Sequence, residues 1–382
     1  MSVEFQLGHQ DHPKVEDFLT REHRGVGAIA LHPKAAAHQR GAAEAARDAG
    51  LAVLFDPRTE RLTHPGLTHA GLPAFTGSVY DLDRLAASPV ARRELVDRVV
   101  TAHPELCTIV TPPYFLISDE RTAHLNLALA EEARIASDRP VRPVVMLRSQ
   151  HGLSIEALAL EYGRARFTEV DLRFTPLGGE NESLRKIRAA FAAADAFRAS
   201  GVRVVLGRSG NIGQAAFAFG HVDGYSVGLG EMEHIDHAAD LRRQNEPPKL
   251  DEAGNKKGGR WEGVYLPGPA VTLSKKRASD LLGHSDVRTR LGCRIGACAN
   301  SLLGPVADFK GHYLHARARE MAVLLDSPPA WRAKAETDRL VRAIELRELI
   351  NTRYRRDGDP VIQTRTLRSL IDGIEEEKSA VA

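Results

Sequence analysis

Short apolar runs recur along the chain, and each is followed by glycine or proline and then by a stretch of helical character. The clearest case is the stretch 201–236. Residues 202–206 are apolar and mostly β-branched, 207–213 contains three glycines, 214–219 carries small and aromatic residues, and 224–230 is a second apolar run. This order predicts a strand, a glycine loop, a helix and a second strand.

The same strand-helix unit repeats over most of the sequence. The predicted strands are 25–31, 51–55, 106–110, 141–147, 169–174, 202–206 and 224–230, with either 263–267 or 270–273 as the eighth. The predicted helices include 35–49, 81–102, 155–162 and 183–200. Strands separated by helices pair in parallel through right-handed crossovers. Eight such units predict an α/β protein with a (β/α)8 TIM barrel. A doubly wound open sheet is the alternative, because one sequence does not reveal strand order.

The pattern changes towards the C-terminus. From His312 onward only helices are predicted, and the longest of them cover 331–355 and 366–377. We therefore expect two parts, a (β/α)8 barrel at 1–290 and a C-terminal helical subdomain at 291–382.

Composition narrows the class of protein. The 382 residues are 43% hydrophobic and 27% charged, which is typical of a globular protein with a large core. No run approaches the roughly 18 apolar residues of a membrane span, and the segment 1–19 lacks the apolar core of a signal peptide. Three cysteines are too few for a disulfide framework. We expect a cytoplasmic protein with no membrane partner, and the sequence does not predict its oligomeric state.

The net charge of +2 conceals an asymmetry along the chain. Residues 271–368 carry 19 Lys and Arg against 11 Asp and Glu, a net charge of +8, so the rest of the chain sums to −6. A basic C-terminal third can meet the phosphates of nucleic acid. The alternative is a set of solvated helix faces with internal salt bridges.

Polar side chains gather where the predicted strands end. In a barrel these ends face one mouth, where active sites form. Acidic and basic groups alternate there, which suits an anionic substrate and a carboxylate that acts as base or nucleophile. The predicted catalytic residues are Asp171, Glu231, Arg148 and Arg173. The predicted substrate-binding residues are His32, Asp56, Arg208, Ser209, Gly210 and Glu233. Internal salt bridges within a barrel are the alternative role for these side chains.

The glycine loop 207–213 precedes a predicted helix. Backbone N–H groups at the start of a helix bind anions, so a phosphate or carboxylate is expected there. A tight turn with no ligand is the other interpretation.

Two cysteines and two histidines follow one another at the start of the helical part. Cys293, Cys298, His312 and His315 have the spacing C-x4-C-x13-H-x2-H, close to that of a Cys2His2 zinc site. Such a closed site is structural, and it would tie the end of the barrel to the helical subdomain. The alternative is a buried thiol pair beside a polar helix face. Cys107 lies within a predicted strand and is expected in the core.

The cysteine segment and one strand resemble a known family. Cys293, Cys298, the segment 312–320 and the glycine-rich strand 225–231 are similar to the corresponding motifs of the tRNA-guanine transglycosylase superfamily, over about a quarter of the chain. Those enzymes have a barrel followed by a zinc subdomain of cysteines and a helix-borne histidine. The resemblance implies a transferase that acts on a nucleobase or nucleic acid and holds a structural zinc ion.

Two other functions fit the sequence. One is a barrel lyase or hydrolase acting on a small phosphorylated or carboxylated metabolite, which the arginines, carboxylates and glycine loop favour. The other is a nucleic-acid-binding protein without catalysis, in which the barrel is a scaffold.

Overall fold

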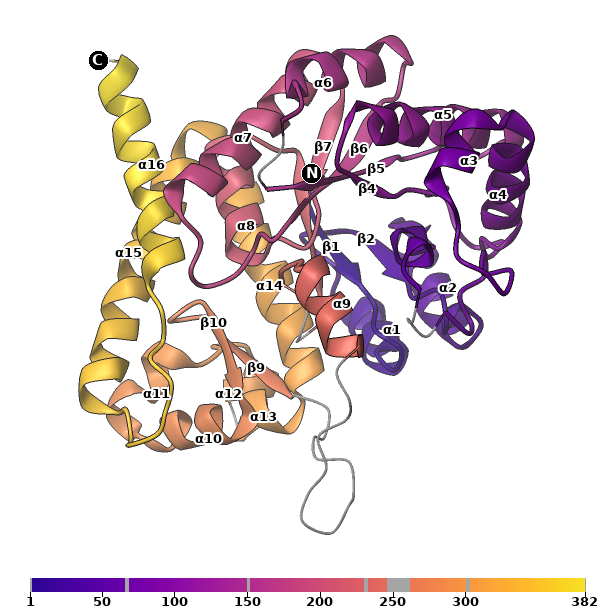
Figure 1. Ribbon diagram of the computed structural model, residues 1–382. Helices are drawn as coiled ribbons and strands as arrows, with labels where there is room; N and C mark the ends of the chain where they lie inside the picture. Colours follow the sequence, from indigo (N-terminus) through magenta and orange to yellow (C-terminus); the bar gives the residue numbers. More distant parts are fainter. Residues whose placement is uncertain are drawn as a thin grey trace.

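Eight parallel strands form one curled sheet in the computed structural model, which describes residues 2–65, 69–149, 152–229, 233–245, 262–299 and 303–381 (Figure 1). The strands are β1 (Val3–Gln6), β2 (Val26–Leu31), β3 (Ala52–Phe55), β4 (Leu116–Ile117), β5 (Val144–Arg148), β6 (Glu169–Thr175), β7 (Arg203–Leu206) and β8 (Gly224–Gly228). Their order across the sheet is β3-β2-β1-β8-β7-β6-β5-β4. Strands go round a (β/α)8 barrel in this order, but no ladder joins β3 to β4 among the described residues. The predicted α/β class is confirmed, and the described strands form a curled half-barrel.

The open side of the sheet is bordered by the segment 106–110, which the sequence predicts as a strand. The amide of Thr108 donates to the carbonyl oxygen of Val53 in β3 at 2.9 Å. Val110 forms a single parallel bridge with Val141, shortly before β5. Prolines on both sides of this segment lack the N–H that a continuous ladder requires. These few bonds therefore replace the predicted strand.

β1 is a central strand that the hydrophobic pattern does not predict. It pairs with both β2 and β8. Val3 and Phe5 are fully buried on one face, and Glu4 and Gln6 are buried on the other. Glu4 accepts two hydrogen bonds from Arg142, at 2.7 and 2.8 Å. The polar residues therefore point into the curve of the sheet, so the strand does not look apolar in sequence.

The two candidates for an eighth strand both form strands, but outside this sheet. β9 (Gly263–Leu266) and β10 (Val271–Ser274) pair with each other as an antiparallel hairpin. The prediction that one of them completes the barrel is wrong, because β1 holds the place beside β8.

Helices follow the strands, as predicted. They are α1 (His12–Arg21), α2 (Arg40–Asp48), α3 (Leu82–Ala87), α4 (Pro89–Thr101), α5 (Glu120–Ala136), α6 (Ile155–Arg164), α7 (Leu184–Ala199) and α8 (Gly210–Phe219), with two 3-10 turns, η1 (Ala36–Gln39) and η2 (Thr59–Thr63). The predicted helix 81–102 is divided at Ser88, whose hydroxyl accepts from the amide of Ala91 and so caps α4, with Pro89 as its first residue.

The C-terminal part is helical apart from the hairpin. Its helices are α9 (His237–Asn245), α10 (Lys275–Gly283), α11 (Ser285–Leu291), α12 (Gly296–Ala299), α13 (Gly304–Ala307), α14 (Phe309–Asp326), α15 (Pro329–Arg353) and α16 (Arg365–Val381). In Figure 1, α15 and α16 run along the side of the molecule next to α8, and the hairpin and α10 to α13 lie below them.

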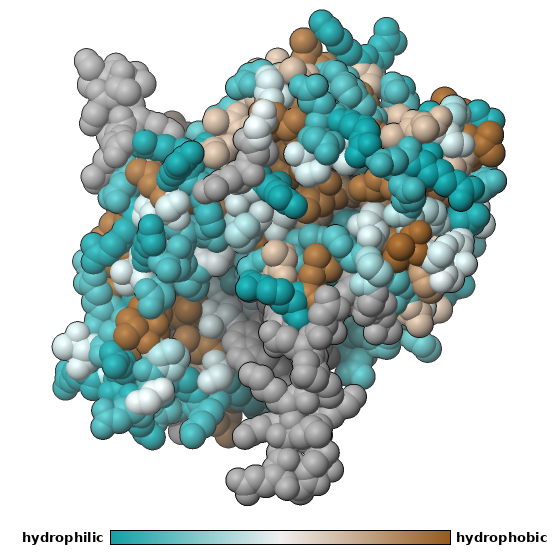
Figure 2. All heavy atoms as spheres, in the orientation of Figure 1, coloured by the Kyte–Doolittle hydropathy of each residue, from teal (hydrophilic) through white to brown (hydrophobic). Residues whose placement is uncertain are grey.

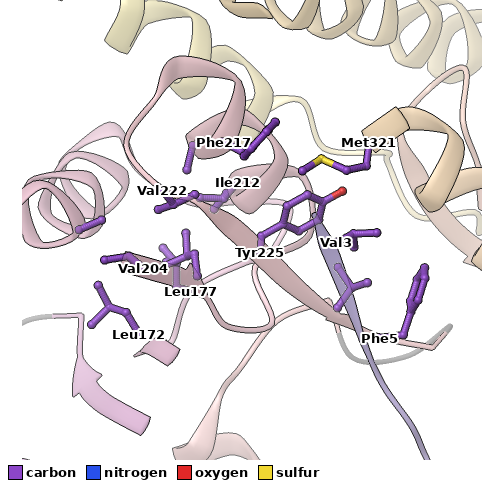
Figure 3. Packing of buried hydrophobic residues seen from close by; sticks show 14 of the residues in the cluster. Val3, Phe5, Leu172, Leu177, Val204, Ile212, Phe217, Val222, Tyr225 and Met321 are labelled. Carbon is purple, nitrogen blue, oxygen red and sulfur yellow. The ribbon is translucent and has the colours of Figure 1, made fainter. Parts of the chain in front are cut away.

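The main hydrophobic core joins the sheet to helices from both parts of the chain. Figure 3 shows Ile212 and Phe217 of α8 beside Tyr225 of β8, with Met321 of α14 close to the Tyr225 ring. A second cluster is centred on the hairpin, α10, α11 and α15. Because this cluster takes members from both sides of residue 290, the boundary between 1–290 and 291–382 stays a prediction.

The surface in Figure 2 is mostly hydrophilic, and hydrophobic residues appear there in small patches. Among the helices that the structure describes, none has the length and apolar character needed to cross a bilayer.

Arg142 provides a test of the polar interior. Arg142→Ala leaves the carboxylate of Glu4 buried without its main partner, so the free energy of unfolding should fall by about 3–5 kcal/mol. Arg21→Ala removes an exposed pair with Asp17 and should cost less than about 1 kcal/mol. Urea unfolding of both variants measures the difference, and equal losses would contradict a buried, stabilising role for the Glu4–Arg142 pair.

Candidate active site and metal centre

A buried network of charged and polar side chains fills the curve of the sheet near the carboxyl ends of its strands. Arg173 of β6 is its centre and is 5% exposed. Its Nη1 donates to Asp56 Oδ2 at 3.0 Å and to the Tyr114 hydroxyl at 2.9 Å, while Nε and Nη2 donate to Asp171 Oδ2 at 3.0 and 2.6 Å. The Tyr114 hydroxyl donates to Asp56 Oδ1 at 2.8 Å. The structure therefore brings together three of the predicted site residues.

Neighbouring opposite charges determine whether Asp56 and Arg173 are ionised in this buried network. Burial alone would raise the pKa of Asp56, but Arg173, Arg58 and Arg208 outweigh it and lower the pKa. Burial alone would lower the pKa of Arg173, but Asp171 and Asp56 raise it well above its ordinary value. Asp56 and Arg173 are therefore a charged pair at neutral pH.

Asp171 differs from Asp56 in having one oxygen to spare. Its Oδ2 accepts both bonds from Arg173, whereas its buried Oδ1 has no hydrogen-bond partner among the residues described. A buried carboxylate oxygen without a partner is costly unless a ligand or water meets it. Gly207 lies directly against it, since a Cβ there would overlap Oδ1 and lie 2.6 Å from Arg173 Cγ. The absence of a side chain at Gly207 therefore leaves the space that the side chains of Asp171 and Arg173 occupy.

The rest of the glycine loop is held by β1 and β8. Arg208 has a left-handed backbone, with φ of 48°, and its Nε donates to Gln6 Oε1. Its amide donates to Ser226 Oγ at 2.9 Å. Burial, with Arg58 and Arg173 nearby, lowers the pKa of Arg208 to about 10. Ser209 is buried, and its hydroxyl donates to the carbonyl oxygen of Leu206 at 2.9 Å.

His32 lies at the margin of the network, close to Arg58 and Asp56. Burial, then Arg58, lowers the pKa of His32 to about 3, so its imidazole is neutral at physiological pH. Its Nδ1 accepts a hydrogen bond from the amide of Lys34 at 3.2 Å. Arg148 is the exposed last residue of β5 and lies near His237. Glu231, the other predicted catalytic carboxylate, lies outside the described residues.

Glu233 is turned towards the C-terminal helices. Its Oε1 accepts from the Tyr313 hydroxyl at 2.6 Å and from Nε of Arg317 at 2.9 Å, both on α14. Arg317 is fully buried and stacks over the ring of Tyr265 at 4.0 Å. Gly210 lies close to the same carboxylate, because a Cβ there would come within 3.1 Å of Glu233 Cβ. The structure thus puts Glu233 in an internal ion pair, and its predicted contact with substrate stays a prediction.

Glu60 is a member of the network that sequence reasoning missed. Burial, then the neighbouring Asp56, raises its pKa, and its Oε2 is buried with no partner among the described side chains. It lies on η2, in the segment that follows β3 and Asp56. Its position shortly after a predicted strand could have suggested a site residue. The sequence does not show that its carboxyl group is buried, because burial depends on the conformation of the segment after β3.

The two cysteines and two histidines meet in one cluster, with their ligand atoms within 4.8 Å of one another. Cys293 Sγ lies 3.4 Å from His315 Nε2, and Cys298 Sγ lies 3.2 Å from the same atom and 3.5 Å from His312 Nδ1. Metal–sulfur bonds of about 2.3 Å and metal–nitrogen bonds of about 2.0–2.1 Å in a tetrahedron place these atoms about 3.5 Å apart. His312 Nε2 lies 2.6 Å from the carbonyl oxygen of Tyr265, which orients the ring with Nδ1 towards the cluster. This Cys2His2 set can hold a metal ion.

Without a cation, the two thiols compete for one proton. The pKa of Cys293 falls to about 2, chiefly because Cys298 donates a hydrogen bond to its sulfur. The same contact raises the pKa of Cys298. A metal ion would replace the shared proton and hold both sulfurs as thiolates.

Comparison of the chain with protein-family models and with curated proteins finds no match. The resemblance to the tRNA-guanine transglycosylase superfamily therefore stays an expectation that rests on the motifs of the sequence.

Gly207 offers a test of the network's packing. Gly207→Ala forces its methyl group against Asp171 and Arg173 and should lower the free energy of unfolding by about 1–3 kcal/mol. Gly283→Ala is the matched control, because no atom lies within 4 Å of a Cβ at that helical position. Thermal unfolding should show a lower Tm for Gly207→Ala only. A Tm equal to that of the control would mean that the two side chains can move away freely.

The cysteine–histidine cluster predicts one metal ion per chain. Elemental analysis should find it in the purified protein, and a chelator should remove it and lower the Tm. Cys298→Ser should lose the ion, whereas Cys107→Ala, at a buried thiol outside the cluster, should retain it. A metal-free protein whose Tm does not respond to the chelator would refute a metal centre here.

Proposed function

We propose that the chain is a glycosyl-transfer enzyme of the base-exchange type that acts on a nucleobase within nucleic acid. The observation that carries the proposal is the spare oxygen of Asp171, a buried carboxylate that Arg173 holds by its other oxygen. The resemblance at the cysteine segment and the basic C-terminal third support the same substrate class.

Two carboxyl groups in unlike surroundings suit this chemistry. In the proposed reaction, Asp171 Oδ1 attacks the sugar carbon C1′, a new C–O bond forms, and the bond from C1′ to the base nitrogen breaks with its electron pair going to the base. Glu60, whose raised pKa favours its protonated form, gives its proton to the leaving base. An incoming base then gives a proton to Glu60 and displaces Asp171, so no other reactant is needed.

The proposal includes a complete barrel and a structural zinc ion. The strand order supports closure across the open side. Two backbone hydrogen bonds support it too: the amide of Thr108 donates to the carbonyl oxygen of Val53, and the amide of Arg142 donates to that of Val110, both at 2.9 Å. Two thiolates and two imidazoles suit zinc, and four protein ligands leave no open position, which is typical of a structural site. Such an ion would fix α14 against the hairpin and take no part in the chemistry.

An enzyme acting on a small anionic metabolite is the second candidate. Arg58, Arg173 and Arg208 all lie near Asp56 and lower its pKa, so three cations surround that carboxylate. A phosphate or carboxylate of a substrate would suit these three guanidinium groups. Added salt separates the candidates, because binding to a nucleic-acid backbone weakens steeply with salt and binding in a small pocket weakens less.

Asp171 is the residue to replace. Labelled guanine, the base that the resemblance suggests, should be incorporated into RNA or DNA by the native protein, and Asp171→Asn should reduce the rate by about 100-fold or more. Asp171→Asn should also abolish a nucleic-acid adduct that survives denaturing electrophoresis. Asp17→Asn, at an exposed carboxylate of α1, should retain both. Exchange at the native rate in Asp171→Asn would refute the assigned nucleophile.

A further inference from the structure

A cavity of about 770 Å³ lies among the C-terminal helices, and none of the network residues around Arg173 lines it. Its walls come from α11, α14 and α15, and from the turn that carries Cys293. Small-molecule sites in proteins occupy about 300–1,000 Å³. The cavity is therefore large enough for a ligand, and the proposed exchange reaction does not use it.

Four arginine side chains at the cavity have no partner among the described residues. Arg290, Arg294, Arg319 and Arg342 are all exposed, and none of their guanidinium groups has a hydrogen bond or ion pair with any residue that the structure describes. Most other arginines of the helical part are paired, as Arg317 is with Glu233 and Glu320. The four come from different segments, so no single helix face accounts for their meeting at one cavity.

A fifth arginine is held in place by a buried carboxylate. Arg339 Nε and Nη2 donate to Glu336 at 2.9 and 2.6 Å, and Glu336 is only 1% exposed. The remaining nitrogen, Arg339 Nη1, is buried and has no partner within the described part of the chain. Arg339 also lines the cavity. A guanidinium fixed by two bonds with a third donor left over is pre-organised for an anion.

The acidic residues of the walls do not cancel this charge. Glu336 is neutralised by Arg339, and Glu320 accepts from Arg317 and from the Tyr265 hydroxyl. Asp338 pairs with Lys334, which leaves Glu345 as the acidic wall residue without a salt bridge to the described residues. The four free arginines therefore give the cavity an excess of positive charge.

We propose that this cavity binds a phosphate-bearing ligand, either a small phosphorylated molecule or a phosphate of a nucleic-acid strand. Guanidinium groups match phosphate oxygens in pairs, and several of them suit a group with three oxygens and up to two charges better than a single carboxylate. Val323, Leu324 and Leu346 supply an apolar wall for a sugar. No aromatic side chain is among the described wall residues, so the bases are not recognised by stacking. This inference does not depend on the reaction at Asp171.

The test uses Arg319→Ala/Arg342→Ala in the full-length protein. Its probes are inorganic pyrophosphate, measured by calorimetry, and a fluorescein-labelled single-stranded oligonucleotide, measured by anisotropy at low salt. Arg47→Ala/Arg93→Ala is the control, because it removes the same charge from two exposed arginines on α2 and α4 that have no partner in the described structure. The cavity variant should bind at least one probe about tenfold more weakly than the native protein, and the control should change by less than about twofold.

The two probes also distinguish the source of the phosphate. Weaker pyrophosphate binding with unchanged oligonucleotide binding would assign the cavity to a small phosphorylated molecule. Weaker oligonucleotide binding without pyrophosphate binding would assign it to a strand. Loss of affinity that is equal in the cavity and control variants, or no binding of either probe by the native protein, would overturn the proposal. Asp171 does not line the cavity, so the effect of Arg319→Ala/Arg342→Ala on pyrophosphate binding tests the cavity whether or not the exchange assay succeeds.

Discussion

The polar interior of the sheet depends on the ion pairs of one buried guanidinium group, that of Arg173. Removing the charge of Arg173 from water is costly unless opposite charges and hydrogen bonds surround it. Asp56 and Asp171 supply the charges, and Tyr114 supplies a further acceptor. Asp56 lies 117 residues before Arg173 in the chain, so the pair fixes two distant strand ends against each other. The carboxyl ends of β3 and β6 are thereby positioned by electrostatics as much as by apolar packing.

The repeating strand-helix unit was predictable because its outer side packs in the ordinary way. Val204 and Leu206 of β7 alternate with their neighbours, face the helices and are fully buried. β1 escaped prediction for the opposite reason: Glu4 and Gln6 are buried inside a polar curve, where burial does not require an apolar side chain. Patterns of hydrophobicity detect the side of a strand that meets helices, and they miss a strand whose other side carries charges.

The candidate site was predictable as a set of positions but not as a set of contacts. The ends of predicted strands supplied Asp56, Asp171 and Arg173, and these do meet. The sequence does not show that Asp171 keeps one oxygen spare, because that depends on which nitrogens of Arg173 face it. It also does not show that Glu233 pairs with Arg317, 84 residues away, since that contact arises from the docking of α14.

Helix α14 carries two sets of contacts on a single rigid element. His312 and His315 belong to the cysteine–histidine cluster that can hold a metal ion, and Tyr313 and Arg317 hold the carboxylate of Glu233 beside the glycine loop. If binding at one of these places shifts α14 and so changes the affinity at the other, binding at the other changes the first affinity by the same factor, because linkage is reciprocal. Through this helix, binding of a metal ion at the cysteine–histidine cluster would be coupled to the position of Glu233 beside the glycine loop.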